Sequence, residues 1–182
     1  ENSSVVSGSP SFSGTATTAV SASAIPYTIT PALGGLTATN YDFTTFNNGN
    51  LTITKANAVI TVTPYHVTYD AAAHTATGSA HGVESPTPVD LTGLLHLTGT
   101  MHTNAGAYAS DAWTFDGNSN YNSTSGTVHD IIDKANATTS VTPYSLTYTG
   151  TAHTATGTAK RVLNDSLVGL DLSGTTHTDA GD

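Results

Sequence analysis

Apolar and polar residues alternate along much of the chain with the two-residue period of a β-strand. The segment 59–63 reads Val-Ile-Thr-Val-Thr, so every second side chain would face a core while the others face solvent. Pro64 ends or bends this strand, because proline has no N–H to donate to a sheet. A second strand is predicted at 66–69, directly beyond the proline. The pattern therefore indicates short β-strands.

The same pattern continues as far as residue 132 and is interrupted by two turns. Strands are predicted at 74–80, 91–98, 107–115 and 121–132. Turns are predicted at 104–106 and 116–120, where Asn, Asp, Gly and Ser are the residue types that favour a reversal of the chain. Short strands separated by turns at these intervals predict a small β-sandwich.

A short helix is the alternative in one pair of segments. The residues at 89–95 and 166–170 are compatible with one or two helical turns. A helix there would suit a β-grasp-like unit, in which a sheet wraps around one short helix. The sequence therefore predicts an all-β, elongated chain of tandem small Ig-like β-sandwich units, with β-grasp-like units as the alternative.

The chain repeats parts of its own sequence in register. The tetrapeptide Lys-Ala-Asn-Ala at 55–58 returns at 134–137, a step of 79 from Lys55 to Lys134. Further matches are 73–78 with 152–157 at the same step, and 99–106 with 174–181 at a step of 75 from His102 to His177. Self-similarity at a fixed period is the signature of tandem repeats. Residues are therefore missing from the second copy between about 83 and 95, where a surface loop tolerates deletion.

This repeat predicts three domains. The segment 1–54 is expected to be the C-terminal part of one unit, 55–133 a complete unit, and 134–182 the N-terminal part of a further, truncated unit. A unit of this size can bury a modest core. Because the last segment would lack its final strands, we expect an exposed strand edge in it.

The charge balance limits the classes of partner. Four Lys and Arg residues stand against 13 acidic residues, giving a net charge of −9. Nucleic-acid binding depends on neutralising phosphates with cations, and anionic membrane surfaces attract the same cations, so neither is an expected partner. The chain has no cysteine, so it forms no disulfides. An extracellular location would then suit a bacterial exoprotein better than a small eukaryotic secreted domain, which usually relies on disulfides.

Three stretches within 5–57 form a recognisable series. They read Tyr-Thr-Ile-Thr at 27–30, Asn-Tyr-Asp-Phe at 40–43 and Asn-Gly-Asn-Leu-Thr-Ile-Thr-Lys-Ala at 48–56. This series resembles the C-terminal part of an MBG-type repeat, which occurs in large bacterial surface and adhesin-like proteins. The middle and final units are similar to bacterial Ig-like repeats of the same proteins, with matching positions at Tyr69, 120–121, 126–128 and 134–135. They depart from the first unit, because 130–133 reads Asp-Ile-Ile-Asp where 51–54 reads Leu-Thr-Ile-Thr.

The resemblance implies a non-catalytic stalk or spacer segment at the bacterial cell surface or in a secreted protein. Its expected partners are the neighbouring repeats of the same chain, together with glycans or other surface proteins. Two alternatives remain open. The segment could be a carbohydrate- or matrix-binding module that serves cell adhesion, or an accessory domain of a secreted enzyme.

Two small groups of residues are candidates for a site. Trp113, Tyr108 and Tyr121 could form an aromatic platform for a sugar, although a unit with so few large side chains also needs them in its core. Asp116, Asn118 and Asn120 open a turn with the spacing of a calcium loop. That loop would continue with Gly at its sixth position and Glu at its twelfth, where this chain has Tyr and Thr, so a plain Asx-rich turn is the alternative.

The remaining polar residues suggest no catalytic machinery. The eight histidines are expected to be surface imidazoles or to bond to backbone at turns, rather than to bind zinc or nickel. No G-x-S-x-G motif accompanies the many serines, and no pair of acids has the pattern of a glycosidase. No cofactor is expected, with calcium at the 116–120 turn as the one candidate ion.

Overall fold

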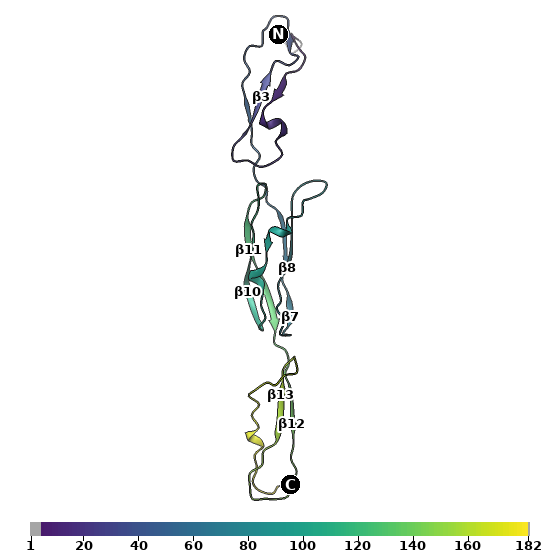
Figure 1. Cartoon of the computed structure of the whole chain (residues 1–182), viewed down its shortest axis with the longest axis vertical. Coiled ribbons are helices and arrows are strands. Elements are labelled where there is room, and N and C mark those ends of the chain that lie inside the picture. The colour runs from purple at the N-terminus through teal and green to yellow at the C-terminus, as the bar shows by residue number, and fades with distance from the viewer. Residues whose placement is uncertain (1–4, 182) are drawn as a thin grey trace. The chain divides into compact units, whose positions relative to one another are not determined.

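The computed structural model describes residues 5–181, and almost all of its regular structure is β-strand. The strands are β1 (Val6–Ser7), β2 (Ser11–Ser13), β3 (Tyr27–Ala32), β4 (Thr37–Ala38), β5 (Gly49–Leu51), β6 (Val59–Thr63), β7 (His66–Thr68), β8 (Thr77–His81), β9 (Leu95–His96), β10 (Gly106–Phe115), β11 (Thr124–Asp133), β12 (Thr138–Thr142) and β13 (Thr156–Lys160). The prediction of an all-β fold is confirmed (Figure 1).

Helix within residues 5–181 is limited to short 3₁₀ segments, and no α-helix occurs there. The named segments are η2 (Thr15–Thr18), η3 (Thr92–Leu94), η4 (Thr98–Thr100) and η5 (Ser173–Thr175). The helix considered at 89–95 is therefore a single 3₁₀ turn, and the one considered at 166–170 does not form. None of these helices is long and apolar enough to cross a membrane.

The described residues form two compact units. Unit 1 consists of the chain through Thr61 together with Ser79–His96 and Thr114–Ser125. Unit 2 consists of Val62–Gly78, Leu97–Trp113 and the chain from Gly126 onward. Strands β6, β8, β10 and β11 each contribute residues to both units. Neither unit tests the domain boundaries expected from the sequence repeat, which remain predictions.

Unit 1 contains several small antiparallel pairings. Strand β3 lies between β2 and β5, with Phe12 opposite Pro31 and Thr28 opposite Asn50, and β1 pairs with β4. Strand β9 pairs with the end of β10, where Leu95 lies opposite Phe115. The buried apolar side chains of this unit are Ala80, Leu91, Phe115 and Tyr121.

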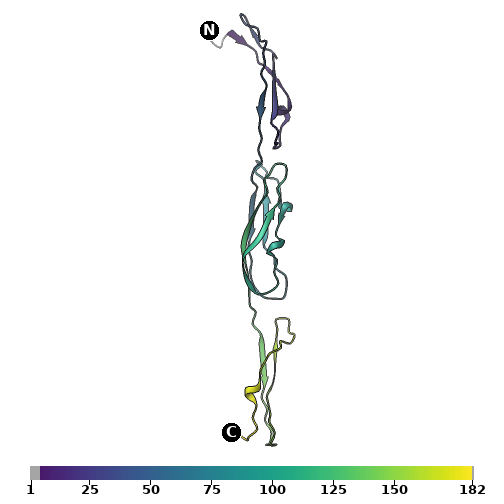
Figure 2. The ribbon, with the colours of Figure 1, turned by 90° about the vertical axis from the view of Figure 1, so that its left-hand side faces the viewer.

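Unit 2 contains one parallel and one longer antiparallel pairing. Strand β11 runs parallel to β7, with Ile132 opposite Val67, while β12 and β13 pair antiparallel over their full lengths. The buried residues of this unit are Ala76, Thr100, Asp111, Asp130, Ile132 and Ala159. Strands β7, β11, β10 and β9 follow one another in a single sheet, and Figure 2 shows β10 and β11 side by side.

Strands form where the alternation of apolar and polar residues predicted them, and they are absent where local turns form instead. Strand β6 has the predicted bounds and alternates between exposed and half-buried residues. The strand predicted at 91–98 is wrong, because η3, the two-residue β9 and η4 replace it. The Asp90 carboxylate accepts the Thr92 N–H at 2.9 Å, and the Thr100 hydroxyl donates to the Leu97 carbonyl at 2.8 Å. Such side-chain bonds to nearby backbone favour turns over a continuous ladder.

Candidate functional site

The beginning and the end of the segment 55–133 lie beside each other as parallel strands. In unit 2, His66, Val67 and Thr68 pair with Ile131, Ile132 and Asp133. The Ile131 N–H donates to the Tyr65 carbonyl at 2.9 Å, and the Tyr69 N–H donates to the Asp133 carbonyl at 2.8 Å. Residues 65 apart in sequence are therefore neighbours throughout this ladder.

Unit 1 contains the same register. Ala56 forms a parallel bridge with Tyr121, in which the Ala56 N–H donates to the Asn120 carbonyl and the Asn122 N–H to the Ala56 carbonyl, both at 2.9 Å. The Asn122 side-chain amide also donates to the Asn57 side-chain oxygen, again across 65 residues. One parallel register thus applies at both ends of the stretch from Ala56 to Thr68.

A buried acid, Asp130, adds a side-chain hydrogen bond to this pairing in unit 2. Asp130 is 0% exposed, and its Oδ1 atom accepts the Tyr65 N–H at 2.8 Å. Its Oδ2 atom has no hydrogen-bond donor among residues 5–181. Burial and the nearby Asp111 carboxyl raise the pKa of Asp130 above its ordinary value, although the hydrogen bond from the Tyr65 N–H lowers it.

Asp111 connects the buried acid to a histidine and a stacked tyrosine. His102 Nε2 and Asp111 Oδ2 are 2.9 Å apart, and Asp111 is 8% exposed. The rings of His102 and Tyr108 stack with centroids 3.5 Å apart and planes 4° from parallel. The Tyr108 hydroxyl donates to the Asn104 carbonyl at 2.6 Å, so the ring is held at both ends.

The Tyr65 side chain belongs to the same cluster as Asp130, Asp111 and His102. Its hydroxyl donates to the carbonyl of the buried Thr100 at 3.2 Å. Burial, followed by the negative charges of Asp130 and Asp111, raises the pKa of the Tyr65 phenol, so it remains a hydrogen-bond donor. These polar groups bond to one another and to the backbone, and the fully buried Asp130 is out of contact with solvent. The arrangement therefore suits holding strands together.

Histidine–aspartate pairs are the feature that sequence reasoning missed. His66 pairs with Asp133 at 2.7 Å, His74 with Asp70 at 2.9 Å, and His96 with Asp116 at 2.8 Å. His66 and His96 are exposed, as expected of surface imidazoles, but the ring nitrogens of these three side chains and of His102 bond to carboxylates rather than to backbone. Only the Asp70–His74 spacing of four residues was visible in the sequence, because the other partners are 67, 20 and 9 residues apart.

The three aromatic candidates for sugar binding are divided between the two units. Tyr121 is 3% exposed and belongs to unit 1, where its hydroxyl donates to the Glu84 carboxylate at 2.5 Å and accepts the Val83 N–H at 3.0 Å. Its ring faces are covered by protein, which corrects the prediction for this residue. Trp113 and Tyr108 are half-buried residues of unit 2, and Tyr108 has one face against His102.

The three calcium candidates use their oxygens for protein contacts. Asp116 pairs with His96, the Asn118 Oδ1 accepts the N–H groups of Asn120 and Tyr121, and the Asn120 Oδ1 accepts the Ala22 N–H. The ammonium group of Lys55 donates to the Asn118 carbonyl at 2.7 Å. These bonds account for the turn without an ion. Calcium binding there stays a prediction.

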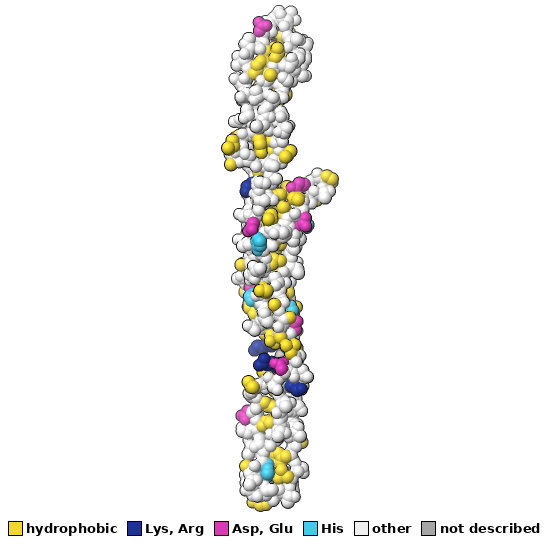
Figure 3. Space-filling view, in the orientation of Figure 1, with side chains coloured by type: hydrophobic (Ala, Val, Ile, Leu, Met, Phe, Trp, Pro, Cys, Tyr) yellow, Lys and Arg dark blue, Asp and Glu magenta, His cyan; other side chains and the backbone are white. Residues whose placement is uncertain are grey.

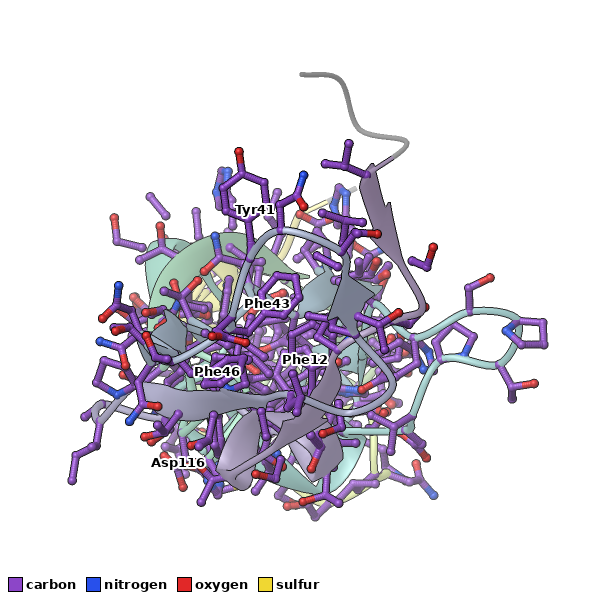
Figure 4. All side chains as sticks on the ribbon, turned by 90° about the horizontal axis from the view of Figure 1, so that it is seen from above. Phe12, Tyr41, Phe43, Phe46 and Asp116 are labelled. Carbon is purple, nitrogen blue, oxygen red and sulfur yellow. The ribbon has the colours of Figure 1, made fainter. Side chains whose placement is uncertain are left out.

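Exposed aromatic rings occur elsewhere in unit 1. Phe12 is 61% and Tyr41 56% exposed, whereas Phe43 and Phe46 are half-buried. Figure 4 shows the Tyr41 ring pointing outward from the ribbon. On the face shown in Figure 3 the acidic side chains are spread out and form no large patch.

Unit 2 also has an open groove of about 840 Å³, lined by residues of the segment 141–181. Its apolar lining includes Val141, Tyr144, Leu146 and Tyr148, and His153 and His177 also border it. No family model, curated protein or solved structure matches the chain. The geometry of the described residues is therefore the basis for assigning a function.

Proposed function

We propose that the chain is a non-catalytic, load-bearing stalk segment of a bacterial extracellular surface or adhesin-like protein. The observation that carries this proposal is the parallel register in which residues near the start of 55–133 pair with residues near its end. In this arrangement the chain enters at one end of the ladder and leaves at the other.

The direction of the strands decides how a pull on the chain is borne. Because β7 and β11 are parallel, a force that separates Lys55 from Lys134 slides one strand along the other. The bonds at Tyr65, Ile131 and Tyr69 are then loaded together, whereas a hairpin pulled at its open end loses its bonds one by one. Resistance to forced unfolding depends on the rate of unfolding, which such simultaneous loading lowers.

The buried cluster supports the same role. The Asp130 carboxyl accepts the Tyr65 N–H directly beside the backbone bond from Ile131 to Tyr65. A hydrogen bond to a charged or buried acceptor is costly to break without a replacement partner. The resemblance of 5–57 to MBG-type repeats and the absence of cysteine favour the bacterial extracellular location within this proposal.

The test is single-molecule force unfolding of the whole chain held by its two ends, with two variants of one residue. Ile131→Pro removes the N–H that donates to Tyr65, whereas Ile131→Val keeps it and shortens the side chain. We expect a lower unfolding force for the proline variant and nearly the parental force for the valine variant. Circular dichroism confirms that each is folded. Equal forces in both variants and the parent would contradict the proposal.

A second candidate function, a carbohydrate- or matrix-binding adhesive module, is favoured by the exposed rings of Phe12 and Tyr41. Exposed aromatic rings can stack on the apolar faces of sugars. A glycan array with the purified chain tests it. Reproducible binding that Phe12→Ala abolishes, and that Val20→Ala at another exposed apolar position leaves unchanged, would support this candidate.

A further inference from the structure

The single Asn–Gly step of the sequence lies at the start of strand β5 in unit 1. It is formed by Asn48 and Gly49, and both residues are exposed. Asn48 lies outside regular structure, whereas Gly49 is the first residue of β5, an edge strand that pairs with β3. Backbone at the end of an edge strand opens more readily than backbone inside a ladder. The step therefore lies where the chain can rearrange locally.

The fold does not require glycine at position 49. The φ angle of Gly49 lies outside the left-handed region, and a Cβ atom added there would meet the Ile29 Cβ atom at 3.8 Å, an ordinary van der Waals distance. Gly117 is the opposite case, because its φ is +69° and an added Cβ atom would lie 2.6 Å from the Tyr121 carbonyl oxygen. Gly117 is needed for its turn. At Gly49 the missing side chain instead leaves the backbone nitrogen accessible to the side chain of Asn48.

The Asn48 side chain is free to approach that nitrogen. Within residues 5–181 no hydrogen bond holds its amide group. In the same unit, by contrast, hydrogen bonds hold the side chains of Asn118, Asn120 and Asn122. Asp116, the acid that precedes Gly117, is likewise held by His96 at 2.8 Å. Asn48 therefore combines an unrestrained amide with a following residue that offers no steric hindrance.

We propose that Asn48–Gly49 is a site of spontaneous covalent modification, at which asparagine is converted to aspartate and isoaspartate. The Gly49 nitrogen attacks the Asn48 Cγ atom and closes a succinimide ring. The Cγ–Nδ2 bond breaks, and the amide nitrogen takes up the proton lost by Gly49 and leaves as ammonia. Water then adds to one of the two ring carbonyls and breaks its bond to the Gly49 nitrogen. Water is the only co-reactant, and nothing is oxidised or reduced.

The products would alter β5 at its first residue. Both add a negative charge to a chain whose net charge is already −9. Isoaspartate also carries the peptide link through its side chain, which lengthens the backbone by one atom immediately before Gly49. Because Gly49 lies opposite Ile29 in the ladder, the longer backbone disturbs the pairing of β5 with β3. We expect faster hydrogen exchange at Gly49–Leu51 in the isoaspartate form.

Incubation of the whole folded chain in heavy-oxygen water at mildly alkaline pH, followed by peptide mapping, tests this inference. Heavy oxygen marks the carboxylates that form during the incubation. Asn50 is the internal control, because it is exposed on the same strand, no hydrogen bond within residues 5–181 holds its side chain, and Leu51 follows it. We expect conversion at Asn48 to be about tenfold faster than at Asn50, which corresponds to a barrier lower by about 1.4 kcal/mol.

Two variants complete the test. Gly49→Ala fits the fold and should slow conversion at Asn48 towards the rate at Asn50, because the added Cβ atom hinders the attacking nitrogen. Asn48→Gln should remove the label at this position, since its longer side chain would have to close a larger ring. Circular dichroism shows that both variants are folded. Equal rates at Asn48 and Asn50, an unchanged rate in Gly49→Ala, or conversion that requires unfolding in urea would overturn the inference.

Discussion

Asp130 is a buried acid whose contribution to the stability of the fold depends on pH. The carboxyl is fully buried on β11, the strand between β7 and β10, where water cannot solvate a negative charge. Burial and the neighbouring Asp111 carboxyl both favour its protonated form, so its pKa lies above the ordinary value of 3.8. The unfolded chain exposes this acid and returns the pKa to that ordinary value.

We expect Asp130→Asn to be more stable than the parent at neutral pH and no more stable in acid. A raised folded-state pKa contributes stability below 3.8 that is lost as the pH rises through the raised value. Asparagine keeps an oxygen for the Tyr65 N–H and does not titrate, so its advantage should grow from about pH 4 to about pH 7. Urea unfolding followed by the fluorescence of Trp113, the single tryptophan, measures it.

The other perturbed acids do not obscure this difference. The pKa values of Asp70, Glu84, Asp90 and Asp171 are lowered, chiefly by hydrogen bonds that they accept, so their contributions are lost as the pH falls. The parent and the Asp130→Asn variant both contain these four acids, so their contributions to stability cancel in the comparison. Parallel stability curves for parent and variant would contradict a raised pKa at Asp130.

Residue-level contacts were also the hardest part to predict from sequence. Asp130 occupies a strand position with no local sign that its partners are Asp111 and the backbone of Tyr65, which is 65 residues away. The burial of Tyr121 in the core was equally hard to predict from the sequence. A tyrosine after a turn has the same sequence appearance whether its ring is covered or free. Distant partners are set by strand pairing, which alternation does not specify.

At the scale of elements, β10 and β11 pack closely because one of them has a glycine where the other has a tryptophan. A Cβ atom added at Gly126 would lie 2.5 Å from the Trp113 ring. Such a distance is far inside van der Waals contact, so any larger residue must displace the indole. The missing side chain at Gly126 therefore leaves the space that the Trp113 ring occupies.

Gly126→Ala should therefore destabilise unit 2 by about 1–3 kcal/mol, the usual range for overpacking. The displaced indole should also shift the tryptophan emission, which comes from Trp113 alone. Gly93→Ala is the matched control, because nothing lies within 4 Å of a Cβ atom at that position. Urea unfolding of both variants distinguishes them, and a neutral Gly126→Ala would show that the indole is not held as described.

The elements themselves were predicted unevenly, for physical reasons. Val59–Thr63 and Gly106–Phe115 form strands almost at the expected bounds, because strict alternation and β-branched or aromatic residues act locally. The 3₁₀ turns at Thr92–Leu94 and Thr98–Thr100 were missed because each depends on one side-chain bond to nearby backbone. The parallel pairing of β7 with β11 was not predicted, since nothing in a strand's own sequence names its partner.

At the scale of the whole molecule, the proposed function depends on the parallel direction in which β7 is paired with β11. The register of 65 residues recurs at Asn57 with Asn122 and at Tyr65 with Asp130. Because of this register, a force along the chain shears the ladder, whereas a force across the ladder peels the paired strands apart. A chain without cysteine allows attachment points to be placed at will.

The most direct measurement compares two pulling directions in one fold. Handles are attached to cysteines kept reduced until coupling, in the pair Asn57→Cys and Lys134→Cys or the pair Asn57→Cys and Asn122→Cys, all at exposed positions. Both pairs lose the same Asn122–Asn57 side-chain bond, so only the direction of force differs. We expect a clearly higher unfolding force between 57 and 134, where the ladder is sheared, than between 57 and 122, where it is peeled apart. Equal forces, or a lower force between 57 and 134, would contradict the proposed function.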